Sequence, residues 1–193
     1  MDDLLNYIET NYNARKVSKY AIGYIHEFYN SIFSDKKHEN LEILEIGIHS
    51  GNSIRIWSEF FSNSKITCID IKEHSSALDL KNKKNIECIY ADAYNVDILH
   101  KLKNKKFDII IDDGPHTFES LNFFIDFYFQ FLNPNGYFIL EDIVDTNWSN
   151  ILLDKISNNV EYKKIIKMAG LQKTKKLIQR WNNGLDVIIC KNN

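Results

Sequence analysis

The chain has 193 residues, of which 44% are hydrophobic and 26% are charged, and its formal net charge is −2. This composition is typical of one globular domain and excludes an intrinsically disordered chain. The near balance of 24 basic and 26 acidic residues gives no strong field that would favour nucleic acid or an anionic membrane as a partner. The lysine-rich stretch 81–84 is interpreted as a solvated face.

Cysteine usage and the amino-terminal segment favour a cytoplasmic setting. Cys68, Cys88 and Cys190 each lie in an apolar run without a CxxC pair, so we expect buried structural thiols rather than a disulfide framework or a zinc site. The N-terminus is acidic and lacks the apolar run of a signal peptide. No stretch approaches the ~18 apolar residues that a membrane span needs. The sequence therefore predicts a cytoplasmic protein.

Helices are predicted before residue 41. A short helix is expected over residues 3–10, and residues 17–33 are expected to form one amphipathic helix, because apolar side chains recur every three or four positions. We interpret the aromatic stripe of this helix as core packing, with a cover over an acceptor pocket as the alternative. Residues 34–40 are polar and predict a loop.

From residue 41 onward, predicted strands and helices alternate, which favours a parallel sheet with helices on both faces. The expected strands cover residues 41–47, 65–70, 86–90, 107–111, 137–140, 161–168 and 185–190. The expected helices cover 52–61, 75–82, 95–103, 117–132 and a segment beyond Trp148, and 133–136 is expected to be a turn. The sequence thus predicts a single α/β, Rossmann-like domain with a mostly parallel seven-stranded sheet. Ligands of such sheets bind at the carboxyl ends of the strands.

The first of these strand ends carries a glycine loop. Glu45 is followed by Gly47 and Gly51, which allow a sharp turn and close backbone approach to a ligand. The GxGxxG pattern of dinucleotide-binding folds is missing, and a tight turn without a ligand is the alternative. Asp70 ends the next strand, where a carboxylate can accept ribose hydroxyls, and Asp92 ends the third, where it can accept from an adenine amino group. Together these strand ends predict a nucleoside site.

Four acids follow the fourth and fifth strands, namely Asp112, Asp113, Glu141 and Asp142. These strands are neighbours in the expected sheet, so the carboxylates would crowd one rim and repel one another. A divalent cation with oxygen ligands would relieve that repulsion. A protonated cluster, or acids that point into solvent, is the alternative.

The motifs at these strand ends resemble a known family. Residues 111–116 read IDDGPH, a phenylalanine-rich helix follows, and residues 133–143 read NPNGYFILEDI. These segments are similar to the metal-dependent sugar O-methyltransferases of macrolide biosynthesis and their cephalosporin-hydroxylase-like relatives. The similarity extends over residues 41–146 and includes GNSIRIWSEFF at 51–61, with its Trp57. The ExGxxxG loop at 45–51 also resembles the first motif of class I S-adenosylmethionine (SAM) methyltransferases.

The resemblance implies a class I methyltransferase fold, with residues 1–40 as helices that pack on a SAM-binding core at 41–193. It also implies roles for individual residues. His116 and Asp113 would be catalytic, His116 as the general base. The metal ligands would be Asp113, Glu141 and Asp142, and the SAM site would include Glu45, Gly47, Gly51, Asp70, Asp92 and Asp112. Asp112 would face the cofactor or orient the site. Pro115 departs from the family, which has Ser at this position.

The function implied is SAM-dependent and Mg²⁺-dependent O-methylation of a hydroxyl on a small molecule such as a sugar. Two alternatives stay open, a metal-independent methyltransferase with structural acids and a SAM- or nucleoside-binding module without turnover. No nucleic acid or membrane partner is expected, and a homo-oligomer is possible. Arg180 and Trp181, in an expected loop over 173–183, would contact an acceptor or a neighbouring subunit.

Overall fold

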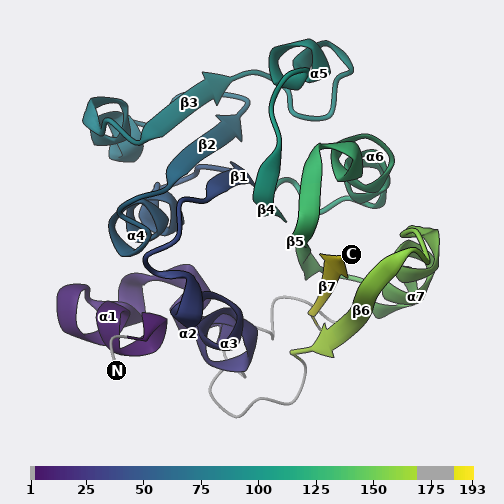
Figure 1. Cartoon of the computed structure of the whole chain (residues 1–193), viewed down its shortest axis with the longest axis horizontal. Coiled ribbons are helices and arrows are strands. Elements are labelled where there is room, and N and C mark those ends of the chain that lie inside the picture. The colour runs from purple at the N-terminus through teal and green to yellow at the C-terminus, as the bar shows by residue number, and fades with distance from the viewer. Residues whose placement is uncertain (1–2, 169–184) are drawn as a thin grey trace.

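The structure is a computed structural model that describes residues 3–168 and 185–193. A seven-stranded sheet of order β3-β2-β1-β4-β5-β7-β6 forms its centre (Figure 1). The first five strands pair in parallel, and β7 runs antiparallel to both β5 and β6. The strands are β1 Glu42–Ile46, β2 Lys65–Asp70, β3 Ile86–Tyr90, β4 Phe107–Asp112, β5 Leu132–Ile143, β6 Val160–Lys167 and β7 Asp186–Asn192. The predicted mostly parallel α/β sheet is confirmed.

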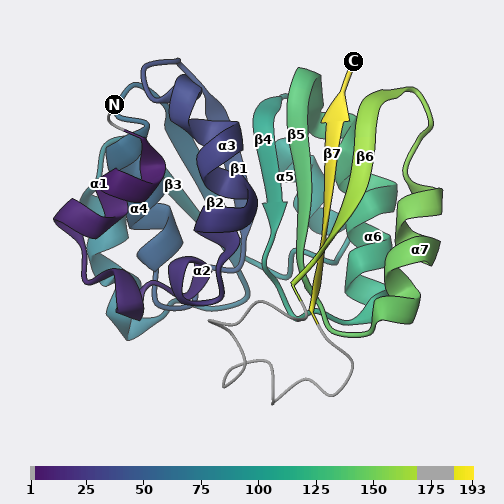
Figure 2. The same ribbon diagram turned by 90° about the horizontal axis from the view of Figure 1, so that it is seen from below.

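Helices cover both faces of this sheet. Figures 1 and 2 show α1 to α4 on one face and α5 to α7 on the other. The α-helices are α1 Leu4–Asn11, α2 Ser18–Ala21, α3 Asn30–Phe33, α4 Asn52–Phe60, α5 Asp97–Leu102, α6 Phe118–Tyr128 and α7 Thr146–Lys155. Short 3-10 turns cover Ala14–Lys16, Ser34–Lys36, Ser75–Asn82 and Phe129–Phe131, and a π-helix covers Ile25–Tyr29.

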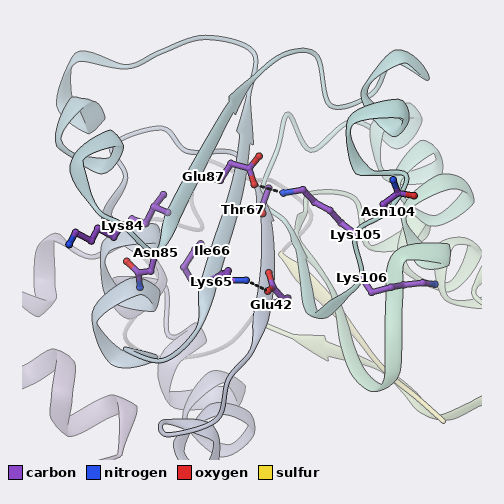
Figure 3. A pocket seen from close by; sticks show the side chains of 11 residues that line it. Glu42, Lys65, Ile66, Thr67, Lys84, Asn85, Glu87, Asn104, Lys105 and Lys106 are labelled. Atoms are coloured by element: carbon purple, nitrogen blue, oxygen red, sulfur yellow. Dashed lines mark hydrogen bonds and ion pairs between the residues drawn. The ribbon is translucent and has the colours of Figure 1, made fainter.

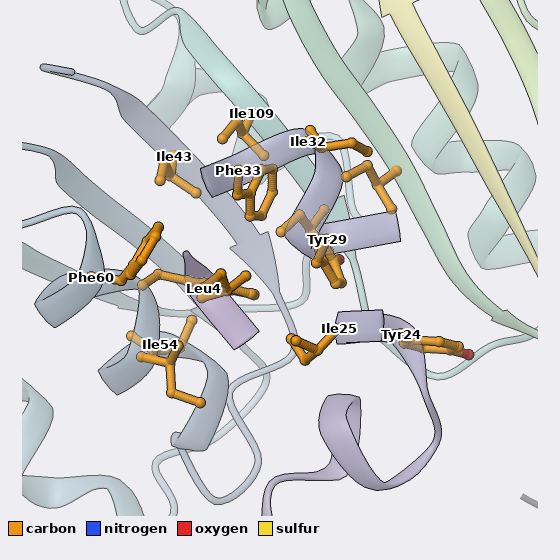
Figure 4. Close-up of a cluster of buried hydrophobic side chains, with 14 of the residues drawn as sticks. Leu4, Tyr24, Ile25, Tyr29, Ile32, Phe33, Ile43, Ile54, Phe60 and Ile109 are labelled. Atoms are coloured by element: carbon orange, nitrogen blue, oxygen red, sulfur yellow. The ribbon is translucent and has the colours of Figure 1, made fainter. Parts of the chain in front are cut away.

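Two hydrophobic cores result, because successive strand residues point to opposite faces. Ile43 and Ile109 pack under the amino-terminal helices and α4, whereas Leu44 and Ile110 pack under α5 to α7. A strand that is buried on both faces needs consecutive apolar residues, which explains the neighbouring Ile43 and Leu44 in β1 and the run Ile109–Ile111 in β4. Figure 4 shows Ile43 and Ile109 beneath Phe33 in the first core.

The amino-terminal helical region differs from the single helix expected over residues 17–33. Gly23 adopts a φ of 103°, which ends α2, and the chain resumes as a π-helix that leads into α3. The aromatic stripe does pack in the core, as expected. Tyr29 and Phe33 lie 5.3 and 5.4 Å from the Trp57 ring, measured between ring centroids.

Three shorter segments also depart from expectation. The expected loop begins with a 3-10 turn at Ser34–Lys36, and Ser75–Asn82 is a 3-10 helix rather than an α-helix. Its two buried residues, Ala77 and Leu80, are three positions apart, which suits the three-residue turn of a 3-10 helix. The expected turn at 133–136 lies within β5, where the register with β4 shifts.

The remaining expectations concern thiols, membrane spans and the segment before β7. Cys68 and Cys190 are buried, whereas Cys88 is half-buried with its Sγ 3.4 Å from that of Cys68. Among the described residues, no helix has both the length and the apolar character that a bilayer crossing requires. The expected loop over 173–183, with Arg180 and Trp181, lies outside the described residues.

Candidate active site

The carboxyl ends of β1, β4 and β5 lie side by side and bring the predicted acids together. Ile46 is paired with Asp112, and Asp112 is paired with Leu140. Asp113 and Glu141, each one position further along, therefore lie at the same level of this rim, Asp113 just beyond β4 and Glu141 within β5. The prediction that strands four and five place their acids on one rim is confirmed.

The backbone at this rim adopts conformations that L-residues rarely occupy. Among described non-glycine residues, positive φ angles occur at His49, His116, Asn135 and Asp142. Three of these four residues surround the acid cluster, and Asn135 lies in the β5 irregularity. Such conformations cost about 1–3 kcal/mol each and tend to gather at functional sites. The backbone strain at this rim is therefore typical of a functional site.

A buried lysine lies inside the acid cluster, where no pattern in the sequence predicted it. Lys19 is 2% exposed. Its Nζ lies 2.8 Å from an Asp113 carboxylate oxygen, donates to Glu141 and is 3.5 Å from Glu45. Burial alone would lower the pKa of Lys19, but these carboxylates outweigh it and raise that pKa well above its usual value. Lys19 is therefore a charged ammonium within the site.

Two tyrosines from the π-helical region complete the inner wall. The Tyr24 hydroxyl donates to Asp142 and the Tyr29 hydroxyl donates to Glu141. In a π-helix the hydrogen bonds join residues five apart, so Tyr24 and Tyr29 both point toward the acids. In an α-helix, residues that share a face are three or four apart. The π-helix thus explains how both hydroxyls reach the cluster.

His116 closes the outer side of the cluster. Its Nε2 lies 3.8 Å from Asp113 Oδ1 and 3.7 Å from Asp142 Oδ2. Its Nδ1 is buried and has no hydrogen-bond partner among the described residues. Asp113, His116 and Asp142 each offer one ligand atom within 4.8 Å of the others, and each is partly exposed. The two carboxylates of this group fit a divalent metal ion, because carboxylate oxygens are common ligands of hard cations, and the His116 imidazole lies beside them.

Glu141 and Asp112 lie deeper than the outer acids. Glu141 is 1% exposed and its oxygens are bonded by Lys19 and Tyr29. Asp112 Oδ1 accepts from the Tyr94 hydroxyl at 2.9 Å and from the Gly114 N–H at 3.0 Å, whereas its Oδ2 has no partner among the described residues. Burial raises the pKa of Asp112 to about 6 against these hydrogen bonds. Through these two hydrogen bonds Asp112 holds the Tyr94 side chain and the backbone of the turn at Gly114 in place.

A cavity of about 310 Å³ lies beside the glycine loop. Gly47, Asp70 and Asp92 line it together with Tyr94 and Asp113. Three predicted nucleoside-site residues, from the ends of β1, β2 and β3, therefore meet in one concave space. Ile71 also lines the cavity and is 72% exposed, which offers an apolar surface to a flat ring.

Asp70 also holds the glycine loop in place. Its Oδ2 accepts from the N–H groups of Ile48 and His49 at 2.8 and 3.2 Å, and its Oδ1 accepts from Lys72 N–H at 3.2 Å. Burial alone would raise the pKa of Asp70, but these three donors hold it below its usual value. Asp70 is thus ionised at neutral pH, and its Oδ1, which accepts only the Lys72 bond, keeps a lone pair for a ligand hydroxyl.

Asp112 does not line this cavity, and neither do the remaining predicted SAM-site residues, Glu45 and Gly51. Glu45 is fully buried and accepts from Ser53 at 2.6 Å and from the Trp57 indole N–H. Gly51 has a φ of 75° and begins α4, where an added Cβ would lie 2.9 Å from Leu80. Both residues shape the loop rather than face the cavity.

A second cavity, of about 280 Å³, adjoins the first. The two share Gly47, His49, Asp113 and Gly114, and His116 lines only the second. Asp113 therefore lies at the boundary between the two spaces, and His116 lies on the side of the second. This arrangement suits a reaction in which two bound molecules meet at their adjoining ends.

A third cavity lies at the opposite, amino-terminal edge of the strands (Figure 3). Lysines line it, but Lys65 pairs with Glu42 at 3.1 Å and Lys105 pairs with Glu87. None of the motif residues lies there. This cavity therefore does not compete with the site at the carboxyl ends.

Sequence reasoning missed Lys19, Tyr24, Tyr29 and Tyr94 as members of the site. Tyr24 and Tyr29 were recognised only as apolar residues of a helix stripe, and Lys19 fell outside that stripe. A spacing of five between residues 19, 24 and 29 is the one available signal, and it has no meaning for an ordinary α-helix.

Comparison with known proteins agrees with this geometry. A family described as a methyltransferase domain matches residues 44–143, which is more than half of the chain. This chain belongs to that methyltransferase family. The matched range begins in β1 and ends in β5, so it contains the glycine loop and every predicted acid of this methyltransferase domain.

Individual relatives support the same family. The mycinamicin VI 2''-O-methyltransferase of Micromonospora griseorubida is 28% identical over 138 residues, or 65% of this chain and 34% of the relative. The demethylmacrocin O-methyltransferase of Streptomyces fradiae is 30% identical over 138 residues, which are again 65% of this chain and 34% of the relative. A structure of the MycE methyltransferase from the mycinamycin biosynthetic pathway, in complex with Mg and SAH, has a TM-score of 0.55 and 27% identity and covers 63% of this chain and 33% of that chain. This methyltransferase thus spans about a third of the length of these relatives.

Proposed function

We propose that this methyltransferase transfers the methyl group of SAM to a hydroxyl of a small molecule such as a sugar, with Mg²⁺ as a second cofactor. The observation that carries the proposal is the pair of adjoining cavities that share Asp113, with His116 lining the second of them. The cavity lined by Gly47, Asp70 and Asp92 would hold SAM, and the adjoining one would hold the acceptor. The relatives named as O-methyltransferases support a hydroxyl as the acceptor, and a further relative, named as an 8-demethyl-8-alpha-L-rhamnosyl tetracenomycin-C 2'-O-methyltransferase, supports a sugar. We also propose a cytoplasmic location.

The proposed metal ligands are Asp113, Glu141 and Asp142. Asp113 and Asp142 face the open side beside His116. Glu141 is already bonded by Lys19 and Tyr29, but an ionised carboxylate has about four lone-pair sites, so it can accept these bonds and also bind a cation. Mg²⁺ prefers such hard oxygen ligands. When bound, it would stabilise negative charge on an acceptor oxygen.

The residues of this chain would then position the reactants and move one proton. Gly47 lets the backbone of β1 and the 112–116 turn lie in direct contact, which brings the two cavities together. His116 lines the second cavity, and its Nε2 would take the proton of the acceptor hydroxyl as general base, since imidazole can accept a proton near neutral pH. The acceptor oxygen would then attack the methyl carbon, with S-adenosylhomocysteine (SAH) as the leaving group. Fixed mutual orientation of the reactants would supply much of the acceleration.

The first test is calorimetric titration of the protein with SAH, with and without Mg²⁺. We expect micromolar binding to the wild type, and at least 10-fold weaker binding to Asp70→Ala, because a hydrogen bond to a charged group contributes about 1.5–3 kcal/mol. The control is Asp97→Ala, an exposed acid at the start of α5. Equal SAH affinity of the wild type and Asp70→Ala would remove Asp70 from the site, and no binding to the wild type would refute the proposed function.

The general base is tested by His116→Ala. We expect the rate of SAH release in the presence of a panel of sugars with vicinal hydroxyls to fall by about 10²- to 10⁴-fold, the usual contribution of a general base. SAH affinity should stay within about two-fold of the wild type, since His116 does not line the SAM cavity. His100→Ala, an exposed histidine on α5, is the control. Full activity of His116→Ala would show that the base assignment is wrong.

One observation favours the metal-independent alternative. The ammonium of Lys19 already balances part of the charge of Asp113 and Glu141, so the acids have a cation without a metal. Treatment with EDTA separates the two mechanisms. Loss of at least 100-fold in activity, restored by Mg²⁺, supports the metal-dependent function, whereas unchanged activity supports the metal-independent one.

A further inference from the structure

We infer that Lys19 is the resident cation of the acid cluster, a positioning residue that links Glu45 to Asp113 and Glu141 and competes with the divalent metal for their negative charge. This inference rests on the proposed function, because it concerns the same metal and SAM sites. On this inference the acid cluster binds two cations, the Lys19 ammonium, which belongs to the chain, and an exchangeable divalent metal ion.

The contacts of Lys19 show why its position is not that of an ordinary ion pair. Its side chain is 3% exposed, whereas those of other lysines in ion pairs, such as Lys65 and Lys105, are 76% and 32% exposed. It reaches three carboxylates at once, and each comes from the end of a different strand, β1, β4 or β5. The Tyr29 ring lies 6.0 Å from Nζ and covers another side. The ammonium is thus held at the point where these three strands end.

The charge of the cluster gives Lys19 its effect on a metal. Glu45, Asp113, Glu141 and Asp142 together carry four negative charges when ionised, and Lys19 is the one lysine or arginine that pairs with any of them in the described residues. Interactions between charges a few ångströms apart are strong in a buried site. The ammonium therefore lowers the attraction of the cluster for an incoming divalent cation. Its removal should strengthen metal binding.

The contact with Glu45 gives Lys19 a second and opposite effect. Glu45 also accepts from Ser53 and Trp57 on α4, so it joins the strand before the glycine loop to the helix after it. Without Lys19 this fully buried carboxylate would lose its cation, which disfavours its ionised form. The loop should then hold its binding geometry less well. Removal of Lys19 should therefore weaken SAH binding.

The test is Lys19→Met, with Mn²⁺ binding followed by electron paramagnetic resonance and SAH binding followed by calorimetry without metal. We expect the Kd for Mn²⁺ to fall at least 10-fold and the Kd for SAH to rise at least 10-fold. A change of opposite sign at the two sites is the signature of a resident cation, since general damage to the fold would weaken both. Lys65→Met, which breaks the exposed pair with Glu42, is the matched control and should change neither value.

Further variants keep the inference testable if Lys19→Met does not fold. Glu141→Gln removes one acid, and Lys19→Met combined with Glu141→Gln removes the ammonium and that acid together. The double variant should bind Mn²⁺ at least 5-fold more tightly than Glu141→Gln alone. The inference would be overturned if folded Lys19→Met bound Mn²⁺ no more tightly than the wild type. It would also be overturned if the folded double variant bound Mn²⁺ no more tightly than Glu141→Gln. Failure of the wild type to bind Mn²⁺ would instead count against the metal of the proposed function. If Lys19→Met bound SAH as tightly as the wild type does, the proposed effect of Lys19 on SAH binding through Glu45 would be overturned.

Discussion

Asp113→Asn should abolish most of the methyl transfer, with an expected loss of about 10³-fold in kcat, because a catalytic metal contributes several kcal/mol to the transition state. Asp113 is the residue that every part of the site shares. It contacts Lys19, faces His116 across 3.8 Å and lines both cavities. An asparagine keeps the shape of the side chain but removes the negative charge that a metal requires. The measurement is the rate of SAH formation in saturating Mg²⁺.

The Mn²⁺ affinity of Asp113→Asn shows whether the loss of activity comes from loss of metal binding. We expect it to fall at least 10-fold, while SAH binding stays measurable, because the nucleoside end of the cavity is formed by Asp70 and Asp92. Asp126→Asn is the matched control, since Asp126 lies on α6 and pairs with Lys155. Wild-type turnover and wild-type Mn²⁺ binding in Asp113→Asn would show that the acids are structural and would favour the metal-independent mechanism.

Gly47→Ala should both destabilise the protein and remove SAH binding. Gly47 has a φ of 94°, and an added Cβ would lie 2.0 Å from the backbone oxygen of Asp113. The obstacle is the main-chain carbonyl of the residue that follows β4, which cannot move aside as a flexible side chain does. Strain and overpacking each cost about 1–3 kcal/mol, so we expect about 3 kcal/mol or more, or a Tm lower by roughly 10 °C.

Thermal unfolding and SAH calorimetry check this prediction, with Gly114→Ala for comparison. At Gly114 an added Cβ would meet the hydroxyl end of Tyr94, and no positive φ is recorded there. The loss of stability should therefore be smaller than at Gly47, although Tyr94 lines the same cavity. A Gly47→Ala variant with wild-type Tm and SAH affinity would show that the contact between β1 and the 112–116 turn is not required.

The sequence by itself determined the sheet and its rim. Apolar runs at 41–47 and 107–111 predicted strands, the second of them covered on both faces, and the alternation with helices predicted a parallel sheet. Since parallel strands end at one edge, the sequence also predicted that Asp113 and Asp142 would meet. These conclusions depend on patterns within short stretches of chain, which a sequence displays directly.

The tertiary structure alone decided what surrounds those acids. Lys19 lies 94 residues from Asp113 and 122 residues from Glu141 along the chain, and no local pattern relates them. The π-helix that points Tyr24 and Tyr29 at the acids replaces the α-helix that the periodicity favoured, because packing on Trp57 and contact with the acids outweigh local helix preference. Burial of a lysine is favourable only where carboxylates from several strands converge on it. That convergence exists only in the assembled fold, and it is the reason that the acid cluster holds the Lys19 ammonium.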